Sequence, residues 1–195
     1  MERKDVNLND VSPMMREYLK TKSEYEGIIL FYRLGDFYEM FFDDAILASH
    51  ELELTLTGKQ AGLKERIPMC GIPHHAVNVY LEKLIEKGYK VAICEQMEDP
   101  KNTKGIVKRE VVQIVSAGTI TSTEIVNEKD FNYIASIIDY NYAYALSYAD
   151  LLSGKTYTTL LPHEEEKLIS YVVNLNIKEV VVEEIMNKYK YVDFV

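Results

Sequence analysis

The sequence predicts a mixed α/β protein in which helices cover mixed sheets. Short apolar runs of strand length alternate along the chain with segments of helical period. Helix signals frame these segments, such as Ser12-Pro13 at a helix start and Gly88 at a helix end. Turn residues such as Ser153-Gly154-Lys155 separate strand candidates later in the chain. Alternation of this kind is typical of sheets packed against helices.

The chain is predicted to begin with a helix, a strand and a second helix. Ser12 is a favoured N-cap residue and the proline after it suits the first helical position, so we expect a helix over 13–24. A glycine breaks this helix, and the apolar run 28–34 is a predicted strand. Residues 36–52 follow the helical period. One face of that second helix would carry Phe41, Ala45, Ala48 and Leu52.

The middle of the chain mixes short elements with irregular connections. Residues 54–57 are a short strand candidate, and the polar segment 58–66 is a predicted loop. Two prolines and a glycine predict an irregular connection over 68–73. A helix should resume near residue 77 and end at Gly88.

Two strands and a linker are expected to follow. Residues 89–94 and 110–115 have the apolar, β-branched composition of strands, and the polar segment 97–105 between them is a predicted loop. Residues 119–130 are rich in Thr, Ser and Glu, which predicts a linker.

A second unit is predicted after the linker. Residues 133–138 and 142–148 form adjacent strand candidates, and 156–161 is a third. Residues 164–175 have helical period, and 179–182 is a short apolar strand. The resulting order β-β-β-α-β resembles the start of a ribonuclease-H-like fold.

Composition describes an ordinary soluble globular protein. The chain has 195 residues, of which 47% are hydrophobic and 27% charged. No apolar run approaches the roughly 18–20 residues of a membrane span, and no apolar core follows the charged start Met-Glu-Arg-Lys-Asp, so we expect neither a membrane segment nor a secretory signal. Cys70 and Cys94 lie in apolar surroundings, which favours a reduced cytosolic protein over a disulfide.

Charge is unevenly distributed. The net charge of −9 argues against a general polyanion binder. Residues 57–119 carry 10 Lys and Arg against 7 Asp and Glu, whereas the segments before and after each carry 6 against 12. Cations spaced along loops can follow phosphates, although a solvated surface explains them equally well. The candidates are Lys59, Lys64, Arg66, Lys101, Lys104, Lys108 and Arg109.

The most informative motif is Gly35-Asp36-Phe37-Tyr38-Glu39, at the expected turn from strand to helix. An apolar wedge between base steps unstacks and kinks a duplex, and this costs least where pairing is already faulty. A carboxylate beside it can accept a hydrogen bond from an unpaired base edge. The Phe-x-Glu pair could therefore detect weak pairing without reading sequence.

A purely structural interpretation of the motif is also open. Asp36 is a good N-cap residue, and Glu39 three positions later completes a pattern like a capping box. On helical spacing Phe37 lies one turn before Phe41, so it could be a core residue.

Several ordered blocks resemble the bacterial MutS family of mismatch-repair proteins. The resemblance is close over about the first 120 residues and looser beyond. The blocks are Ser12-Pro13-Met14-Met15 with Tyr18, the segment from Phe31 to Ala45, Leu54-Thr55-Leu56-Thr57, Ile67-Pro68-Met69-Cys70-Gly71-Ile72-Pro73-His74-His75-Ala76, Val91-Ala92-Ile93-Cys94-Glu95-Gln96, and the segment from Val112 to Thr119.

The resemblance implies recognition of mispaired and unpaired bases in duplex DNA. Phe37 would enter the minor groove and stack on the mispaired base, and Glu39 would hydrogen-bond to it. Tyr38 would be a supporting residue. Lys59, Leu34 and Met69 are candidates for contacts to the DNA backbone or for supporting roles. The chain departs from the family pattern at Leu34, where Met is common, and at Gly58-Lys59-Gln60, where a Lys-Arg-Gly run is common.

The resemblance also implies an organisation into domains and a set of partners. Residues 1–119 would be the mismatch-recognition domain, 120–130 a linker, and 131–195 the first part of a ribonuclease-H-like connector domain, so the chain would be an N-terminal fragment. We expect no enzymatic activity and no cofactor in this fragment, because the family's ATPase, with its ATP and Mg²⁺, lies in a C-terminal domain. Expected partners are mismatched DNA, MutL and, in the intact protein, a second copy; the expected location is the bacterial cytoplasm, at the nucleoid.

Three other patterns suggest different chemistry. Ala149-x-x-x-x-Gly154-Lys155-Thr156 resembles a phosphate-binding loop, but β-forming residues follow it, so a hairpin turn is expected. Asp139 and Asp150 raise the alternative of a metal-dependent nuclease, although aspartates beside turns are routine. Cys70, His74 and His75 cluster without the paired spacing of a zinc site.

Overall fold

The computed structural model describes residues 3–98, 105–119 and 132–182. Its internal contacts divide the chain into two compact units, Met1–Val115 and Ser116–Val195. The predicted linker 120–130 lies outside the described residues. Both units combine sheets with helices, so the prediction of a mixed α/β fold is confirmed.

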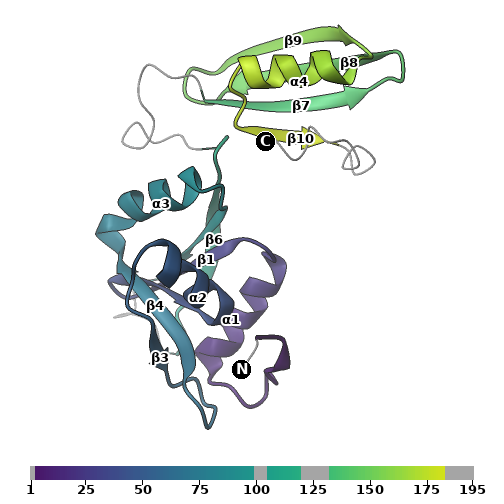
Figure 1. The fold of residues 1–195 in the computed structure, drawn as a ribbon. Helices are drawn as coiled ribbons and strands as arrows, with labels where there is room; N and C mark the ends of the chain where they lie inside the picture. The colour runs from purple at the N-terminus through teal and green to yellow at the C-terminus, as the bar shows by residue number, and fades with distance from the viewer. Residues whose placement is uncertain (1–2, 99–104, 120–131, 183–195) are drawn as a thin grey trace. The chain divides into compact units, whose positions relative to one another are not determined.

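Within the described residues, the first unit is a six-stranded mixed sheet with three α-helices (Figure 1). The strand order is β3-β4-β2-β1-β5-β6, in which only β1 and β5 run parallel. In chain order the elements are η1 (Arg3–Asp5), α1 (Pro13–Glu24), β1 (Ile29–Leu34), β2 (Phe37–Phe41), α2 (Phe42–Glu51), β3 (Thr57–Lys59), β4 (Ile67–Pro73), η2 (His74–Ala76), α3 (Val77–Glu86), β5 (Val91–Gln96) and β6 (Arg109–Val115).

The first helix has the predicted bounds. The Ser12 hydroxyl accepts from the amide of Met15 at 3.4 Å, and the following proline takes the first helical position. Side chains of α1 pack on one face of the sheet, where Tyr18 meets Tyr32 and Phe41 edge-to-face at centroid distances of 5.3 and 4.8 Å.

The predicted helix over 36–52 is wrong in its first part. Residues 37–41 form strand β2, and the helix begins only at Phe42. Residues 37–41 are rich in aromatic side chains, which favour strands, and they pair with β1 and β4 on either side. The helical face that suggested the longer helix belongs almost entirely to later residues. Phe42 marks the switch with a φ of 54°, a strained value for an aromatic residue. Asp36 is in a turn and Glu39 on a strand, so neither can form the capping box.

The irregular connection predicted over 68–73 is also wrong. These residues belong to strand β4, which pairs with both β2 and β3. The sheet tolerates the prolines because Pro73 ends the strand and Pro68 lies beyond the register shared with β2. Strand β3 covers 57–59, so it starts at the end of the predicted strand 54–57 and enters the predicted loop.

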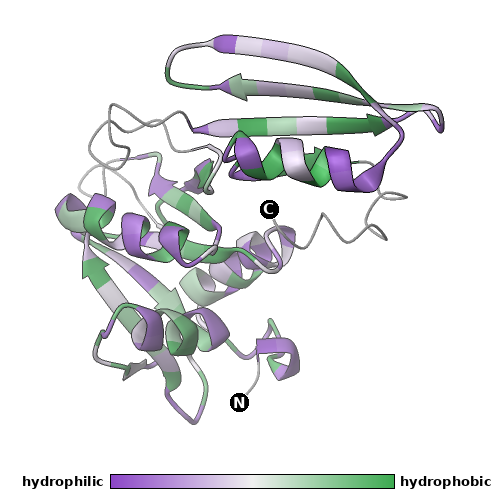
Figure 2. Ribbon diagram, turned by 45° about the horizontal axis from the view of Figure 1, so that its top comes forward, coloured by the Kyte–Doolittle hydropathy of each residue, from purple (hydrophilic) through white to green (hydrophobic). Residues whose placement is uncertain are grey.

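As far as the structure describes it, the second unit is a four-stranded sheet with one helix, in the predicted order β-β-β-α-β. The sheet order is β10-β7-β8-β9, with β10 parallel to β7 and the remaining pairs antiparallel. Helix α4 buries Leu168 and Val172, one turn apart, in the core of this unit. Figure 2 shows the alternation of polar and apolar residues along α4. The elements are β7 (Tyr133–Asp139), β8 (Ala143–Asp150), β9 (Lys155–Pro162), α4 (Glu165–Asn174) and β10 (Glu179–Val182).

A buried ion pair joins three elements of the first unit. Lys22 of α1 lies 2.8 Å from the carboxylate of Asp44 on α2, and both side chains are under 10% exposed. The same carboxylate accepts from the amide of Leu30 on β1 at 2.9 Å. Burial raises the pKa of the Asp44 carboxyl, and Lys22 opposes that rise. The pair therefore fixes both helices to the strand that leads into the candidate site.

Removing the charge of only one partner of the Lys22–Asp44 pair should destabilise the fold. We expect Asp44→Asn to lower the free energy of unfolding by about 3–5 kcal/mol, because Lys22 keeps a buried charge without its counter-ion. The double variant Lys22→Met, Asp44→Asn should be more stable than Asp44→Asn alone, since it removes both charges and keeps an acceptor for Leu30. Urea unfolding of the parent, the single variant and the double variant measures these free energies of unfolding. A double variant that is no more stable than Asp44→Asn would contradict the expectation.

Candidate nucleic-acid interface

Phe37 stands at the tip of a β-hairpin. Strands β1 and β2 are joined by the two-residue turn Gly35-Asp36, and Leu34 pairs with Phe37 across it. Of the two turn residues only Gly35 has a positive φ, 61°, which fits a type II′ turn with glycine at its first central position. The Phe37 side chain is 48% exposed, whereas Phe41 at the other end of the strand is fully buried. The core interpretation of Phe37 is thus wrong.

Strand alternation gathers five of the predicted site residues on one face of the sheet. Phe37 and Glu39 point to the same side because they are two residues apart on β2. Leu34 lies opposite Phe37, and both Leu34 and Met69 pack against the edge of the α1-side core. Lys59 reaches this face from β3, where it contacts Glu39.

Glu39 and Lys59 form an ion pair beside the exposed phenylalanine. Their side chains are 18% and 27% exposed, and the Lys59 ammonium also lies 5.4 Å from the centre of the Phe41 ring. Gly71 pairs with Glu39 from β4, and a Cβ there would lie only 3.2 Å from the Tyr38 carbonyl oxygen. A glycine at this position therefore lets β4 approach the backbone of β2 closely. The sequence motif did not reveal Gly71, because its role follows only from the register.

Tyr38 points to the opposite face of the sheet. Its hydroxyl donates to the carboxylate of Glu95 on β5, and the Arg33 guanidinium lies 5.5 Å over its ring. Burial and the neighbouring Glu95 raise the pKa of Tyr38 to about 12, so the hydroxyl remains a donor at neutral pH. Tyr38 therefore links β2 to β5 on the face of the sheet opposite to the one that carries Phe37.

The predicted cations differ in their surroundings. Lys108 pairs with Glu110, and Arg109 donates from Nε to the Arg33 carbonyl at 2.7 Å while lying 5.2 Å over the Tyr32 ring. Lys64 and Arg66 are exposed in and beside the β3–β4 connection. Lys101 and Lys104 lie outside the described residues. Lys59, on β3, is the predicted cation that contacts Glu39.

The other sequence patterns do not assemble into sites. The segment resembling a phosphate-binding loop is the β8–β9 hairpin turn, as predicted, and strand β9 follows it directly in place of a helix. Asp139 ends β7 whereas Asp150 pairs with Tyr133 at the start of that strand, so they are about 20 Å apart, too far to share metal ions. Their carboxylates instead accept from nearby turn amides, of Asn141 and Ser153 respectively.

The cysteine–histidine cluster is likewise dispersed. Cys70 is buried and donates to the Ala45 carbonyl at 3.4 Å, and burial raises the pKa of its thiol to about 12. His74 and His75 lie beyond the end of β4, in η2. Within residues 3–98, 105–119 and 132–182, no group of three or more His, Cys, Asp or Glu side chains is placed to hold a metal ion.

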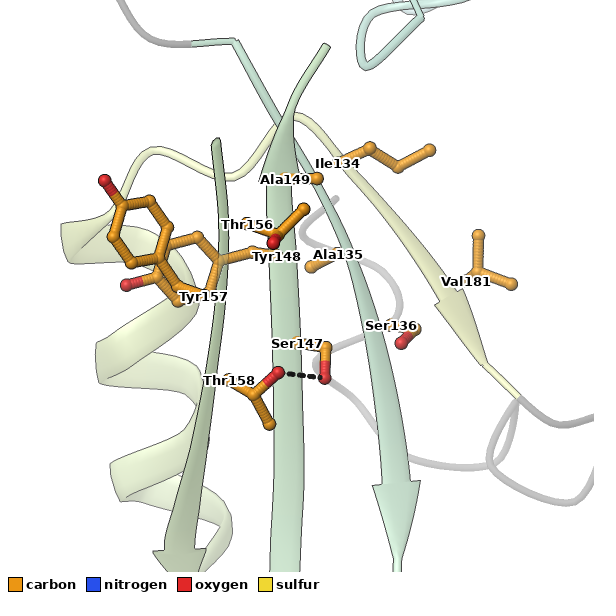
Figure 3. A pocket seen from close by; sticks show the side chains of 10 residues that line it. All are labelled: Ile134, Ala135, Ser136, Ser147, Tyr148, Ala149, Thr156, Tyr157, Thr158 and Val181. Atoms are coloured by element: carbon orange, nitrogen blue, oxygen red, sulfur yellow. Dashed lines mark hydrogen bonds between the residues drawn. The ribbon is translucent and has the colours of Figure 1, made fainter. Parts of the chain in front are cut away.

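A hollow of about 280 Å³ lies on the sheet of the second unit (Figure 3). Its lining includes Ser147 and Thr158, whose hydroxyl groups are hydrogen-bonded at 3.0 Å, together with alanines and aliphatic side chains. The lining also includes the rings of Tyr148 and Tyr157. In the part of the chain that the structure describes, no helix has the length and apolar character needed to cross a membrane.

A family model and individual relatives of known name point to the same protein family. Residues 12–124 match the family model described as MutS domain I. The chain is 50% identical over 178 residues to the DNA mismatch repair protein MutS of Listeria innocua serovar 6a, covering 91% of this chain and 21% of that protein. It is 48% identical over 182 residues to MutS of Bacillus mycoides strain KBAB4, covering 93% and 20% respectively. The chain thus spans about a fifth of the length of these relatives.

Proposed function

Because this chain belongs to the MutS family, we propose that it recognises mispaired or unpaired bases in duplex DNA during mismatch repair. The observation that carries the proposal is that Phe37, at the tip of a hairpin, is 48% exposed. Glu39 is the next residue of β2 on the same face of the sheet. A large aromatic side chain so exposed at the end of a paired strand is suited to enter a groove as a wedge.

The wedge acts where base pairs are easily unstacked. Phe37 enters the minor groove, stacks on the mispaired base and kinks the duplex at that step. A mismatched step costs less to unstack than a paired one, so selectivity comes from deformability instead of from the pattern of groove donors and acceptors. This suits a family that must find many kinds of mispair with one residue.

Glu39 and Lys59 supply the polar part of the mechanism. In the free protein the two groups neutralise each other. When Phe37 enters the duplex, Glu39 turns to hydrogen-bond the unstacked base, and Lys59 exchanges its carboxylate partner for a backbone phosphate. Leu34, which pairs with Phe37 across the turn, supports the wedge, and Met69, which pairs with Phe41, supports the other end of β2. The pair thereby prevents Glu39 from presenting an uncompensated negative charge to the DNA.

The relatives are about five times longer than this chain, and further properties belong to the proposal. Residues 1–119 serve as the recognition domain and 131–195 as the first part of a connector. The full-length gene product forms a homodimer, hydrolyses ATP in a separate domain and recruits MutL in the cytoplasm. Capture of purified MutL by this chain tests whether the second unit takes part in recruitment, and absence of capture would contradict that part.

Removal of the wedge should abolish discrimination without unfolding the protein. In the natural full-length gene product that carries this sequence, we expect Phe37→Ala to lower the affinity ratio of a one-base bulge over matched duplex by about 1–3 kcal/mol, the range for a base–aromatic stack. Binding titrations at fixed salt measure the ratio. Val79→Ala, at a position 55% exposed on α3, is the matched control and should leave it unchanged. A large fall in melting temperature for Phe37→Ala, or an unchanged ratio, would contradict the proposal.

The ion pair should appear as coupling between two substitutions. Lys59→Ala should weaken matched and bulged duplexes alike and reduce the salt slope by about 0.9, as expected for one lost phosphate contact. Glu39→Ala should raise affinity for matched duplex, since it removes a negative charge and frees Lys59. The effects should not add in the double variant. Lys87→Ala, which breaks a 2.8 Å pair with Glu51, is the control. Strict additivity, or a Lys59→Ala loss confined to bulged DNA, would count against this role.

A further inference from the structure

Both carbonyl groups of the turn that presents Phe37 accept hydrogen bonds from residues outside the turn. The Gly35 carbonyl accepts from Nε of Arg33 at 2.5 Å. The Asp36 carbonyl accepts from the backbone amide of His74 at 2.9 Å, and Nδ1 of the same residue lies 3.1 Å from it. A two-residue turn at the end of an exposed hairpin would ordinarily leave these carbonyls to water.

The two residues are themselves anchored in the sheet. Arg33 belongs to β1, and its guanidinium lies 3.6 Å from the carboxylate of Glu95 on β5 and over the ring of Tyr38. His74 directly follows Pro73, which ends β4 and pairs with Phe37. The turn is therefore fastened from the β5 side by Arg33 and from the β4 side by His74.

We propose that Arg33 and His74 are positioning residues that hold the Phe37 hairpin in its inserting conformation before DNA arrives. The inference rests on the proposed function of Phe37 as a wedge. A wedge on a loose turn must lose conformational freedom when it enters the duplex, and that cost falls only on the inserted complex. A turn that is already fixed in the free protein avoids this loss of conformational entropy on insertion. The hydrogen bonds to the turn therefore raise the preference for bulged over matched duplex without raising affinity for matched DNA.

The hydrogen bond from His74 sets a chemical requirement. Nδ1 must carry a proton to donate to the Asp36 carbonyl, which holds for the imidazolium and for one neutral tautomer. An asparagine amide at the same position carries an N–H donor on a side chain of similar reach. His75 is exposed in the same short helix, with its ring edge-to-face to that of His74 at 5.8 Å, and is a matched control.

Substitution of His74 tests the inference through DNA binding. In the full-length gene product, His74→Ala should lower the ratio of bulge to matched-duplex affinity by roughly 2- to 10-fold, the effect of one lost hydrogen bond, and leave matched-duplex affinity unchanged. His74→Asn should restore most of the ratio, and His75→Ala should not alter it. An equal loss for both duplexes, an unchanged ratio in His74→Ala, or failure of His74→Asn to restore it would overturn the inference.

A second measurement distinguishes the positioning role of Arg33 and His74 from the role of Phe37 itself. Amide hydrogen exchange of Phe37 in the free protein should be faster in His74→Ala and in Arg33→Met than in the parent or in His75→Ala. Unchanged exchange in both variants would refute the fastening. If amide exchange and the His74 variants behave as expected, Phe37→Ala must also lower the ratio of bulge to matched-duplex affinity. If Phe37→Ala lowers this ratio but His74→Ala does not, Phe37 keeps its role as the wedge and the positioning role of His74 is refuted.

Discussion

Strand β2 is hydrogen-bonded on both sides, to β1 and to β4, and this constraint determines where every side chain of the site points. A strand paired on both sides cannot slip by one residue without turning its buried side chains to solvent and its exposed ones to the core. Met40 and Phe41 are fully buried on opposite faces, so the register is fixed from both directions. Phe37, at the end of the same strand, is thereby held outside the core and Glu39 beside it.

The proposed function brings an acidic chain to a polyanion. A net charge of −9 gives little general attraction to DNA, so the proposal needs local cations beside Phe37. The ion pair between Glu39 and Lys59 balances the charge of the surface beside Phe37. On the opposite face of the sheet, Tyr38 donates to Glu95, and Arg33 lies over the Tyr38 ring and pairs with Glu95. These contacts hold β2 from the face that does not carry Phe37.

Local signals sufficed to predict much of the fold. The cap at Ser12 defined α1, and the pattern of turns and strands after residue 132 correctly predicted the second unit. The motif around Phe37 was found from the sequence, but its structural setting was not. Four aromatic or apolar residues in five satisfy both a strand and a helix, and the choice depended on pairing with β4, which lies about thirty residues later in the chain. Gly71, Arg33 and His74 acquire their roles only through that pairing and the turn it positions, so no local pattern could reveal them.

The central claim is that Phe37 touches the unpaired base, and photochemical cross-linking tests it most directly. A photoreactive benzoyl-phenylalanine would replace Phe37 in the full-length gene product, and the same analogue at Val79 would serve as the control. The account predicts that cross-links from position 37 map to the unpaired base of a bulged duplex and its neighbours, that matched duplex gives few, and that position 79 gives none. Cross-links from position 37 that are equally frequent on matched DNA, or that avoid the bulge, would contradict it.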